Sequence, residues 1–468
     1  MSKTETAGTQ KKHPMLSEPV SKLLPQFAIP AIMANLVSAL YNIVDQIFIG
    51  NKVGYYGNAA TNVAFPITTV CMALGLLIGV GSASNFNLEL GRGNETKAQK
   101  VAGTSLGTLL LAGVFLLTVI GLFMHPMLVF FGATDEILSY AETYVTITMW
   151  GIPFLLISTG GNQLIRSDGS PRWSMACMVS GAVINIILDY VFVYRCDWGI
   201  AGAAAATVIG QVVSAALVAA YIPRFKNIHL SVRDFCPRGR VLLSIVALGL
   251  TPMFNNLSNL VVQLVLNNLL RSYGAVSVYG SEIPLAVAGI VTKINTIFGA
   301  VVLGIANGLQ PIAGFNYGAG QYQRVQEAYR LGRKLCFFLS IGAFLCFELL
   351  TEPIISLFGA ENELYMQFAT SYLRIFLFCT FLNGVQILST IFFSVIGKAK
   401  KGAFLAVTRQ VLLLIPFLVL FSVLGGVDGI KYAGPAADTA AFIVTMWMIH
   451  REFREINGVR ASQKSTSL

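Results

Sequence analysis

Asp189 is the only charged residue in an apolar stretch that runs from Ala182 to Val193, and Asn185 precedes it by four positions. Residues four apart in a helix lie on one face, so these two side chains are expected to be neighbours. A carboxylate inside a membrane costs several kcal/mol unless it has a partner, a water-filled cavity or a bound ion. If this stretch spans a membrane, Asp189 therefore marks a functional site.

The composition of the chain indicates an integral membrane protein. Of its 468 residues, 55% are hydrophobic and 12% are charged, whereas soluble domains have about 25% charged residues. The mean hydropathy is +0.69. Apolar blocks of about 18 residues or more predict transmembrane helices. We therefore expect an all-α polytopic membrane protein with twelve such helices, at 24–50, 58–84, 101–124, 139–161, 174–194, 201–222, 241–270, 283–313, 335–352, 363–393, 403–424 and 433–449.

Lysine and arginine are distributed unequally between the two sides of the predicted membrane region. If both termini are cytoplasmic, 25 of the 32 basic residues fall in cytoplasmic segments and four fall in outer segments. This excess follows the positive-inside rule and sets the expected orientation. The net charge of +10 then reflects topology and attraction to anionic lipid, and a nucleic-acid-binding surface is not expected.

Several other functional classes are excluded by missing motifs. The seven cysteines stand singly, without CxxC or Cys/His spacing, so a metal or redox site is not expected. No Ser/His/Asp set or phosphate-binding loop is present, so we expect neither an enzyme nor an ATP-binding domain. The N-terminus does not resemble a signal peptide. Residues 1–19 and 451–468 are expected to be cytoplasmic tails, with 1–18 and 457–468 disordered.

The chain contains two related halves. The motif Phe131-Gly-Ala-Thr-Asp-Glu is echoed by Phe358-Gly-Ala-Glu-Asn-Glu, and Leu90-Gly-Arg-Gly is echoed by Tyr317-Gly-Ala-Gly. This repeat predicts two six-helix halves, 20–222 and 241–450, joined by a cytoplasmic linker, 223–240. An even number of helices gives both halves the same orientation, so they are parallel repeats. Two such bundles flanking a central cleft form a transporter architecture.

The two halves, the glycine loops that begin at Leu90 and Tyr317, and the motif Asn185-Ile-Ile-Leu-Asp189 resemble the multidrug and toxic compound extrusion (MATE) family. The resemblance covers nearly the whole chain and is greatest to the bacterial DinF- and MepA-like branch. It implies a multi-pass secondary active transporter in the cell membrane of a prokaryote. Such a protein exports organic, often cationic, compounds by antiport with protons or sodium ions and needs no other cofactor. Its partners would be small-molecule drugs or toxic compounds and the lipid bilayer, and we expect a monomer.

Three polar residues on different predicted helices share one depth in the membrane. At about 1.5 Å per residue, Asp45 and Asp189 lie about 8 Å below the outer boundary and Thr207 about 9 Å below it. Asn185 lies one turn deeper on the Asp189 face. These residues supply two carboxylates, an amide and a hydroxyl, an oxygen set suited to a hard cation or to protons. The MATE resemblance places the cation site of the N-terminal half at these four positions.

Two neighbouring carboxylates repel each other when both are charged, so such a pair can take up a proton and release it when an ion or drug arrives. The alternative is that the two acids are unrelated. In that case Asp45 would face the outer headgroups and Asp189 would pair with a backbone group.

The second half does not repeat these acids. Asn267 and Phe417 occupy the places that correspond to Asp45 and Asp189, so ion coupling in this half is not expected. A related branch of the family keeps an acidic cation site there, and this sequence departs from that branch.

Three charged residues are nevertheless buried in the predicted helices of the second half. Arg409 falls near the inner end of its predicted helix and Asp438 near the outer end of its own, so a direct pair is not expected. Arg409 would instead extend toward the inner surface. Lys293 lies about ten residues into its helix. It either lines the cleft or packs against polar groups of the helix at 241–270.

Pro30 lies fifteen residues before Asp45 in the first predicted helix, where a proline removes a backbone hydrogen bond and kinks the helix. In the MATE family this helix can bend at such a proline when the acids change charge, so Pro30 is a candidate hinge. A static kink is the alternative. A multidrug cleft combines apolar and aromatic walls with a few polar groups. Our candidates for its lining are Met33, Tyr41, Asn42, Phe65, Met149, Phe154, Asn162, Met178, Phe254, Asn255, Asn259, Gln263 and Lys293.

A flippase for lipid-linked oligosaccharide precursors, with the same superfold, is the alternative function. Such proteins favour a cationic central cavity. This chain offers only Lys293 and Arg374 as candidates for one.

Replacing Asp189 by Asn should abolish transport and leave the protein folded, because the amide keeps the shape of the carboxylate and loses its charge. The measurement is gradient-driven drug efflux from proteoliposomes. Efflux at the wild-type rate by Asp189→Asn would show that this carboxylate takes no part in coupling.

Overall fold

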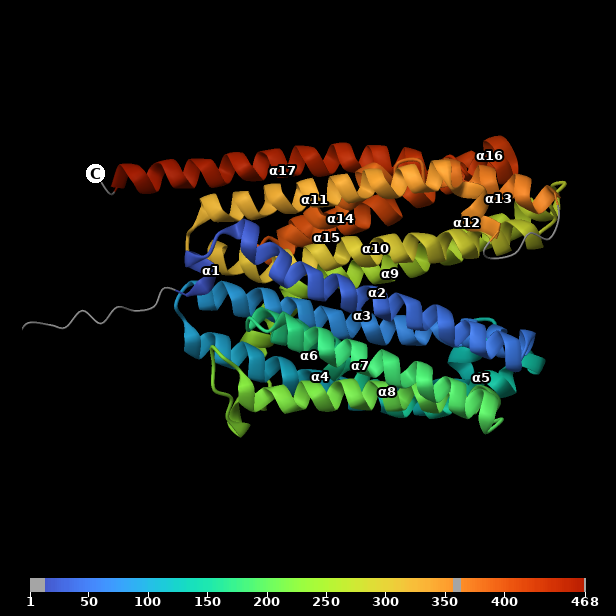
Figure 1. The fold of residues 1–468 in the computed structure, drawn as a ribbon, viewed down its shortest axis with the longest axis horizontal. Helices are drawn as coiled ribbons and strands as arrows, with labels where there is room; N and C mark the ends of the chain where they lie inside the picture. The colour runs from blue at the N-terminus through green and yellow to red at the C-terminus, as the bar shows by residue number, and fades with distance from the viewer. Residues whose placement is uncertain (1–12, 357–362, 467–468) are drawn as a thin grey trace, which may run out of the picture.

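The computed structural model describes residues 13–356 and 363–466, and within these ranges every regular element is a helix (Figure 1). The first half contains α1 (Pro14–Ser17), α2 (Val20–Lys52), α3 (Tyr55–Gly91), α4 (Glu95–Phe130), α5 (Asp135–Thr148), α6 (Ile152–Ser167), α7 (Pro171–Asp189) and α8 (Gly199–Tyr221). The second half contains α9 (Gly239–Ala275), α10 (Glu282–Gly318), α11 (Tyr322–Leu349), α12 (Thr351–Ser356), α13 (Glu363–Phe376), α14 (Thr380–Val395), α15 (Ala399–Val407), α16 (Ile415–Ile430) and α17 (Ala433–Thr466).

The expected all-α membrane fold is confirmed. Among the described residues, nine helices are long and apolar enough to cross a membrane, and the bent pair α13 and α14 makes a tenth. The remaining two expected spans correspond to α11 and α17, which carry polar and charged turns at one end. The repeat motif at 358 falls largely outside the described residues. In Figure 1 the helices of the first half form one bundle and those of the second half form another beside it.

The two bundles pack most closely near the end of the molecule where α1 and the end of α17 lie (Figure 1). There, α10 packs directly against the backbone of α2 at Gly304 and Gly308, which have no side chains. A Cβ atom added at Gly304 would lie 2.5 Å from Ile32 Cα, and one at Gly308 would lie 2.6 Å from Ala28 Cα. Both distances are far below van der Waals contact, so only glycine permits this approach.

A further contact between α2 and α10 involves Asn35, whose Nδ2 donates a hydrogen bond to the carbonyl oxygen of Ala300 at 3.3 Å. The two bundles diverge toward the opposite end of the molecule (Figure 1). The bundles are therefore in close contact at the end where α1 lies, here called the closed end, and stand farther apart at the other end.

The short helix α1 fastens the closed end. Arg324 Nη2 donates hydrogen bonds to the carbonyl oxygens of Met15 at 3.0 Å and Glu18 at 2.6 Å, and Arg324 Nε donates to Asn316 Oδ1 at 3.0 Å. Met15 is buried, and its carbonyl oxygen also accepts a bond from Asn316 Nδ2. These contacts explain why residues 14–18 are ordered, contrary to the expected disorder of 1–18. Residues 1–12 lie outside the described part of the chain.

The residue before α1 bridges both halves. The His13 ring stacks on Phe315 of α10, with ring centroids 4.4 Å apart, and His13 Nε2 lies 3.2 Å from Oδ1 of Asn227 in the linker between the halves. His13 Nδ1 accepts a hydrogen bond from the backbone N–H of Met15, which caps α1. The N-terminal segment therefore contacts the linker and the second bundle together.

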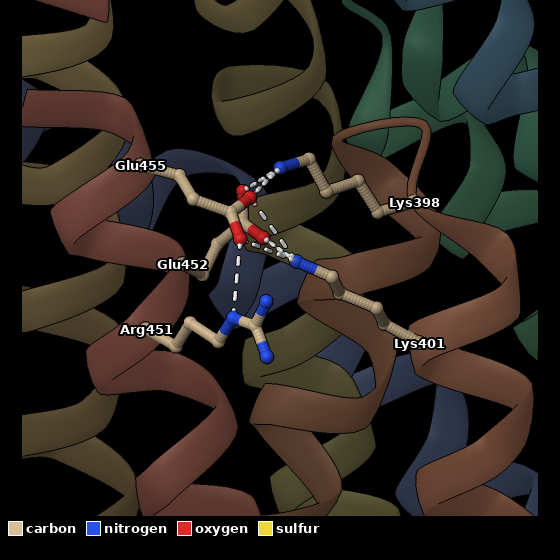
Figure 2. Close-up of polar contacts among 5 residues, drawn as sticks. All are labelled: Lys398, Lys401, Arg451, Glu452 and Glu455. Atoms are coloured by element: carbon tan, nitrogen blue, oxygen red, sulfur yellow. Dashed lines mark hydrogen bonds and ion pairs between the residues drawn. The ribbon is translucent and has the colours of Figure 1, made fainter. Parts of the chain in front are cut away.

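The expected disorder of 457–468 is also wrong for most of that segment, because α17 continues to Thr466. An ion cluster holds its polar end against the turn that precedes α15 (Figure 2). Lys398 Nζ lies 2.5 Å from Glu452 and 2.9 Å from Glu455, and Lys401 Nζ lies 2.7 Å from Glu452. Arg451 adds a further contact to Glu455. The hydrogen bonds from Lys398 and Lys401 hold the pKa of the Glu455 carboxyl below its usual range.

The expected separation of Arg409 and Asp438 is wrong, because Arg409 Nε donates to Asp438 Oδ1 at 2.8 Å. The expected separation requires α16 to run toward the outer surface up to its last residue and α17 to begin at that same depth. The backbone instead reverses at Gly426, which has a φ of 59°. Gly429 then lies directly against the Phe421 carbonyl, so α17 begins deeper than expected. A buried charge paired in this way is far less costly than an isolated one.

The helix α2 carries Pro25 and Pro30 in its interior, and its backbone is helical through both. The helix α2 is therefore not interrupted at Pro30. Sharp interruptions occur elsewhere, at Phe123 in α4 and between α13 and α14, whose axes differ by 49°.

Replacing Arg324 by Ala should favour opening of the closed end, because it removes three hydrogen bonds from α11, two to the segment at α1 and one to α10. At about 0.5–1.5 kcal/mol per bond, the ratio of open to closed molecules should rise at least several-fold. The change can be measured as the distribution of spin-label distances between α2 and α10 near this end. Arg330→Ala, an exposed change on the same helix, is the control and should leave the distribution unchanged. Identical distributions for both variants would contradict this role.

Candidate cation-coupling site

The structure brings Asp45 of α2 and Asp189 of α7 together, with their carboxyl groups in hydrogen-bonding contact. The side chain of Asp189 is fully buried and that of Asp45 is partly buried. One oxygen of each carboxyl, Oδ1, is buried and has no hydrogen-bond partner. Two acids thus share one enclosed space between two helices and face each other there.

Close packing of α7 on α8 places Asn185 beside Thr207. A Cβ atom added at Gly181 would lie 2.7 Å from the Gly210 carbonyl oxygen, and one added at Gly210 would lie 2.7 Å from the Gly181 carbonyl oxygen. This glycine pair lets the two backbones approach one turn from Asn185 and about two turns from Asp189. In the amide orientation that satisfies both of its ends, Asn185 Nδ2 donates to Asp189 Oδ2 at 3.3 Å and Asn185 Oδ1 accepts from the Thr207 N–H at 3.1 Å.

All four residues that the sequence singled out therefore lie in one cluster, contributed by α2, α7 and α8. Their arrangement offers carboxylate, amide and hydroxyl oxygens from three directions. Two negative charges in this enclosed space repel strongly, and a single proton or a monovalent cation would relieve the repulsion. Among the described residues no group of three or more His, Cys, Asp or Glu side chains is placed to hold a metal ion.

Tyr144 of α5 is a member of the cluster that our sequence analysis missed. Its hydroxyl lies near Thr207, and it lies close enough to Asp45, Asp189 and Tyr41 to interact with them electrostatically. The depth argument that linked the acids could have found it. Tyr144 lies five residues into its predicted helix, which puts it about 8 Å below the outer boundary, level with the acids.

A second feature without a sequence signal is the backbone directly after Asp189. The helix changes from α to π geometry at Tyr190–Arg195. Single π turns inside α-helices are rare and are frequent at functional sites, because they alter which side chains face a neighbour. Here the change begins at the residue that follows the buried acid. The π turn thus lies between Asp189 and the outer end of its span.

The residues expected to line the cleft differ in their exposure. Met33, Asn42, Phe65, Phe154 and Asn259 are exposed, and Tyr41, Met149, Met178, Phe254, Asn255, Gln263 and Lys293 are half-buried. Asn162 is buried and donates to the Ser158 carbonyl oxygen at 2.7 Å. Asn259 accepts a hydrogen bond from Gln410 Nε2 at 2.6 Å. Tyr41 belongs to the acid cluster rather than to an open wall.

Two parallel bundles of membrane-spanning helices, closed at one end and enclosing an acid pair in one bundle, define a polytopic membrane transporter. The MatE family model matches residues 30–191 and 253–420, and the chain belongs to this family. The family consists of transporters and not of enzymes. The resemblance noted from the sequence is thus confirmed.

Similar proteins include the multidrug export protein MepA of Staphylococcus aureus (strain NCTC 8325 / PS 47), which is 24% identical over 435 residues. The match covers 92% of this chain and 94% of that protein. MepA of Staphylococcus saprophyticus is also 24% identical, over 432 residues, with the same coverage. These relatives support the expected DinF- and MepA-like branch.

Solved structures have the same fold. A multidrug resistance MATE family transporter of the MOP superfamily in its outward-facing conformation superposes with a TM-score of 0.89, at 24% identity, over 96% of this chain and 100% of that one. A MATE structure in the bent conformation has a TM-score of 0.87 at 24% identity, and the match covers 96% of this chain and 98% of that one.

Replacing Tyr144 by Phe should weaken ion coupling without unfolding the protein, because it removes one hydroxyl from the cluster and keeps the ring. Loss of one hydrogen bond near a charge corresponds to about a tenfold higher concentration of the coupling ion at half-maximal transport. Tyr140→Phe, at an exposed tyrosine one turn earlier in the same helix, is the matched control. Equal ion dependence in both variants would place Tyr144 outside the functional cluster.

Proposed function

We propose that this protein exports organic, often cationic, compounds from the cell by antiport with protons or sodium ions. The observation that carries the proposal is the contact between Asp45 and Asp189, two acids enclosed in the first bundle of a transporter fold. The names of the MepA relatives, which are multidrug export proteins, support the choice of substrates. Asp45, Asn185, Asp189 and Thr207 are the proposed coupling residues.

The coupling would work through the charge of the acid pair. A proton or sodium ion that enters the cluster removes the repulsion between the carboxylates and stabilises one arrangement of the surrounding helices. A ligand shifts the balance between two states only when it binds one state more tightly. Ion binding and drug binding would therefore favour opposite openings of the cleft. Under the positive-inside orientation, with both termini in the cytoplasm, the state described here is open to the outside.

Pro30 has a proposed part in this cycle. It lies on the helix that carries Asp45, and it leaves a backbone carbonyl of α2 without its usual N–H partner. Such a position can bend when charges farther along the helix change. We propose that α2 is held nearly straight in the present state and bends at Pro30 when the acid pair takes up its ion.

The location that follows is the bacterial cytoplasmic membrane, with the chain crossing it many times and acting as a monomer. The flippase alternative is not favoured, because the MepA relatives are export proteins for drugs. In addition, Arg374, one of the two basic residues considered for a cationic cavity, already has a partner within the protein. Its Nε donates a hydrogen bond to Thr351 Oγ1 at 2.9 Å.

The test is transport by the purified protein in proteoliposomes on which a proton gradient and a sodium gradient are imposed separately. Drug efflux should follow one gradient, and Asp45→Asn and Asp189→Asn should each reduce it to the rate of protein-free vesicles. Drug movement that neither gradient drives would refute antiport. Efflux that persists in both variants would refute the assignment of the acid pair while leaving export in place.

A further inference from the structure

Lys293 of α10 lies on the helix face that meets the first bundle. It precedes Gly304 by eleven residues, and eleven residues at 3.6 per turn bring a side chain back to within about 20° of the same direction. Gly304 and Gly308 mark that direction, because they pack directly on Ile32 and Ala28 of α2. The helix α10 is continuous from Glu282 to Gly318, with helical backbone between Lys293 and Gly304.

The level of Lys293 follows from the pairing of α2 with α10. These helices run in opposite directions, since Ala28 lies at Gly308 and Ile32 at Gly304. Extending this register places Lys293 opposite position 43 of α2. The outermost contact described above, from Asn35 to Ala300, lies seven residues closer to the closed end, or about 10 Å away. Lys293 therefore lies farther than this contact from the closed end, on the side toward which the two bundles diverge (Figure 1).

Within the described residues, Lys293 is half-buried and has no ion pair and no side-chain hydrogen bond. The helix α9 beside it contains no acid. The acid nearest in level on α2 is Asp45, but thirteen residues separate it from Ile32. That spacing turns its side chain about 140° away from the face that meets α10. Asp45 is instead in contact with Asp189 inside the first bundle.

The other buried charges of the second bundle differ from Lys293 in this respect. Arg409 is paired with Asp438, and Lys431 is held by Asp428 and Ser371. A lysine at mid-membrane depth is costly unless it faces water or a partner, and such residues mark substrate pathways. Lys293 has no such partner among the described residues, so a partner from outside the protein would have to be an anion or a hydrogen-bond acceptor.

We propose that Lys293 binds an acidic group of the exported compound and so makes the transporter selective for zwitterions, in which an organic cation also carries a carboxylate. The proposal rests on the proposed export function. The proposed substrates are often cationic, and a compound that also carries a carboxylate supplies an acidic group for Lys293. Its ester retains the cation and loses the group that Lys293 recognises.

The test compares two dyes with the same cationic ring system, rhodamine B, which carries a free carboxylate, and its ethyl ester. Binding to the purified full-length protein is followed by fluorescence polarisation, and uptake is followed in proteoliposomes. Lys293→Gln should bind rhodamine B about tenfold more weakly than wild type and should bind the ester within twofold of wild type. Lys293→Arg should keep the preference for the carboxylate.

Arg271→Gln is the control for a general loss of positive potential, because it removes a charge from the exposed end of α9. This variant should bind both dyes as wild type does. Equal weakening of both dyes by Lys293→Gln, or no change in either, would overturn the proposal. So would tighter binding of the ester than of rhodamine B by wild type. In any of these cases, uptake of the ester that depends on Asp189 would still support the proposed export function. Gradient-driven transport of neither dye by wild type would count against both.

Discussion

The contact between two carboxyl groups inside the first bundle is the constraint around which this structure is organised. Asp45 and Asp189 approach each other where water is scarce, and each keeps a buried oxygen without a partner. In such surroundings two like charges cannot be accommodated without a proton, a cation or strong hydrogen-bond donors. The amide of Asn185 and the hydroxyl of Tyr144 border this space and adjust its polarity without cancelling the charge.

The rest of the first bundle can be understood as the support for that contact. The mutual approach of Gly181 and Gly210 brings α7 and α8 together about two turns from Asp189, so Thr207 reaches the cluster. The helix α2, which carries Asp45, also forms the seam with α10 through Ala28 and Ile32. One helix therefore belongs both to the acid cluster and to the contact between the bundles. That double membership gives a physical route from the charge of the cluster to the opening of the molecule.

The two halves have a similar arrangement of helices, but their buried charged residues are partnered differently. The second bundle neutralises its intramembrane acid internally, since Asp438 is paired with Arg409. The first bundle leaves its acids without a cation from the protein. An ion pair of the first kind stabilises one arrangement, whereas an unpaired carboxylate can respond to an ion from solution. The two bundles thus differ in how they hold their buried acids.

Much of this was readable in the linear sequence, because hydropathy and charge act locally. Long apolar blocks have to become helices in a bilayer, and the rise per residue places Asp45, Asp189 and Thr207 at one depth without any knowledge of packing. Their lateral arrangement was decided by tertiary structure, since depth does not determine how a helix is rotated or which neighbour it meets. The glycine contact of α7 with α8 and the inclusion of Tyr144 arise in this way. The reversal at Gly426 shows the same limit, because one residue in a left-handed conformation changed the level of α17 and created the Arg409–Asp438 pair that the helix lengths had argued against.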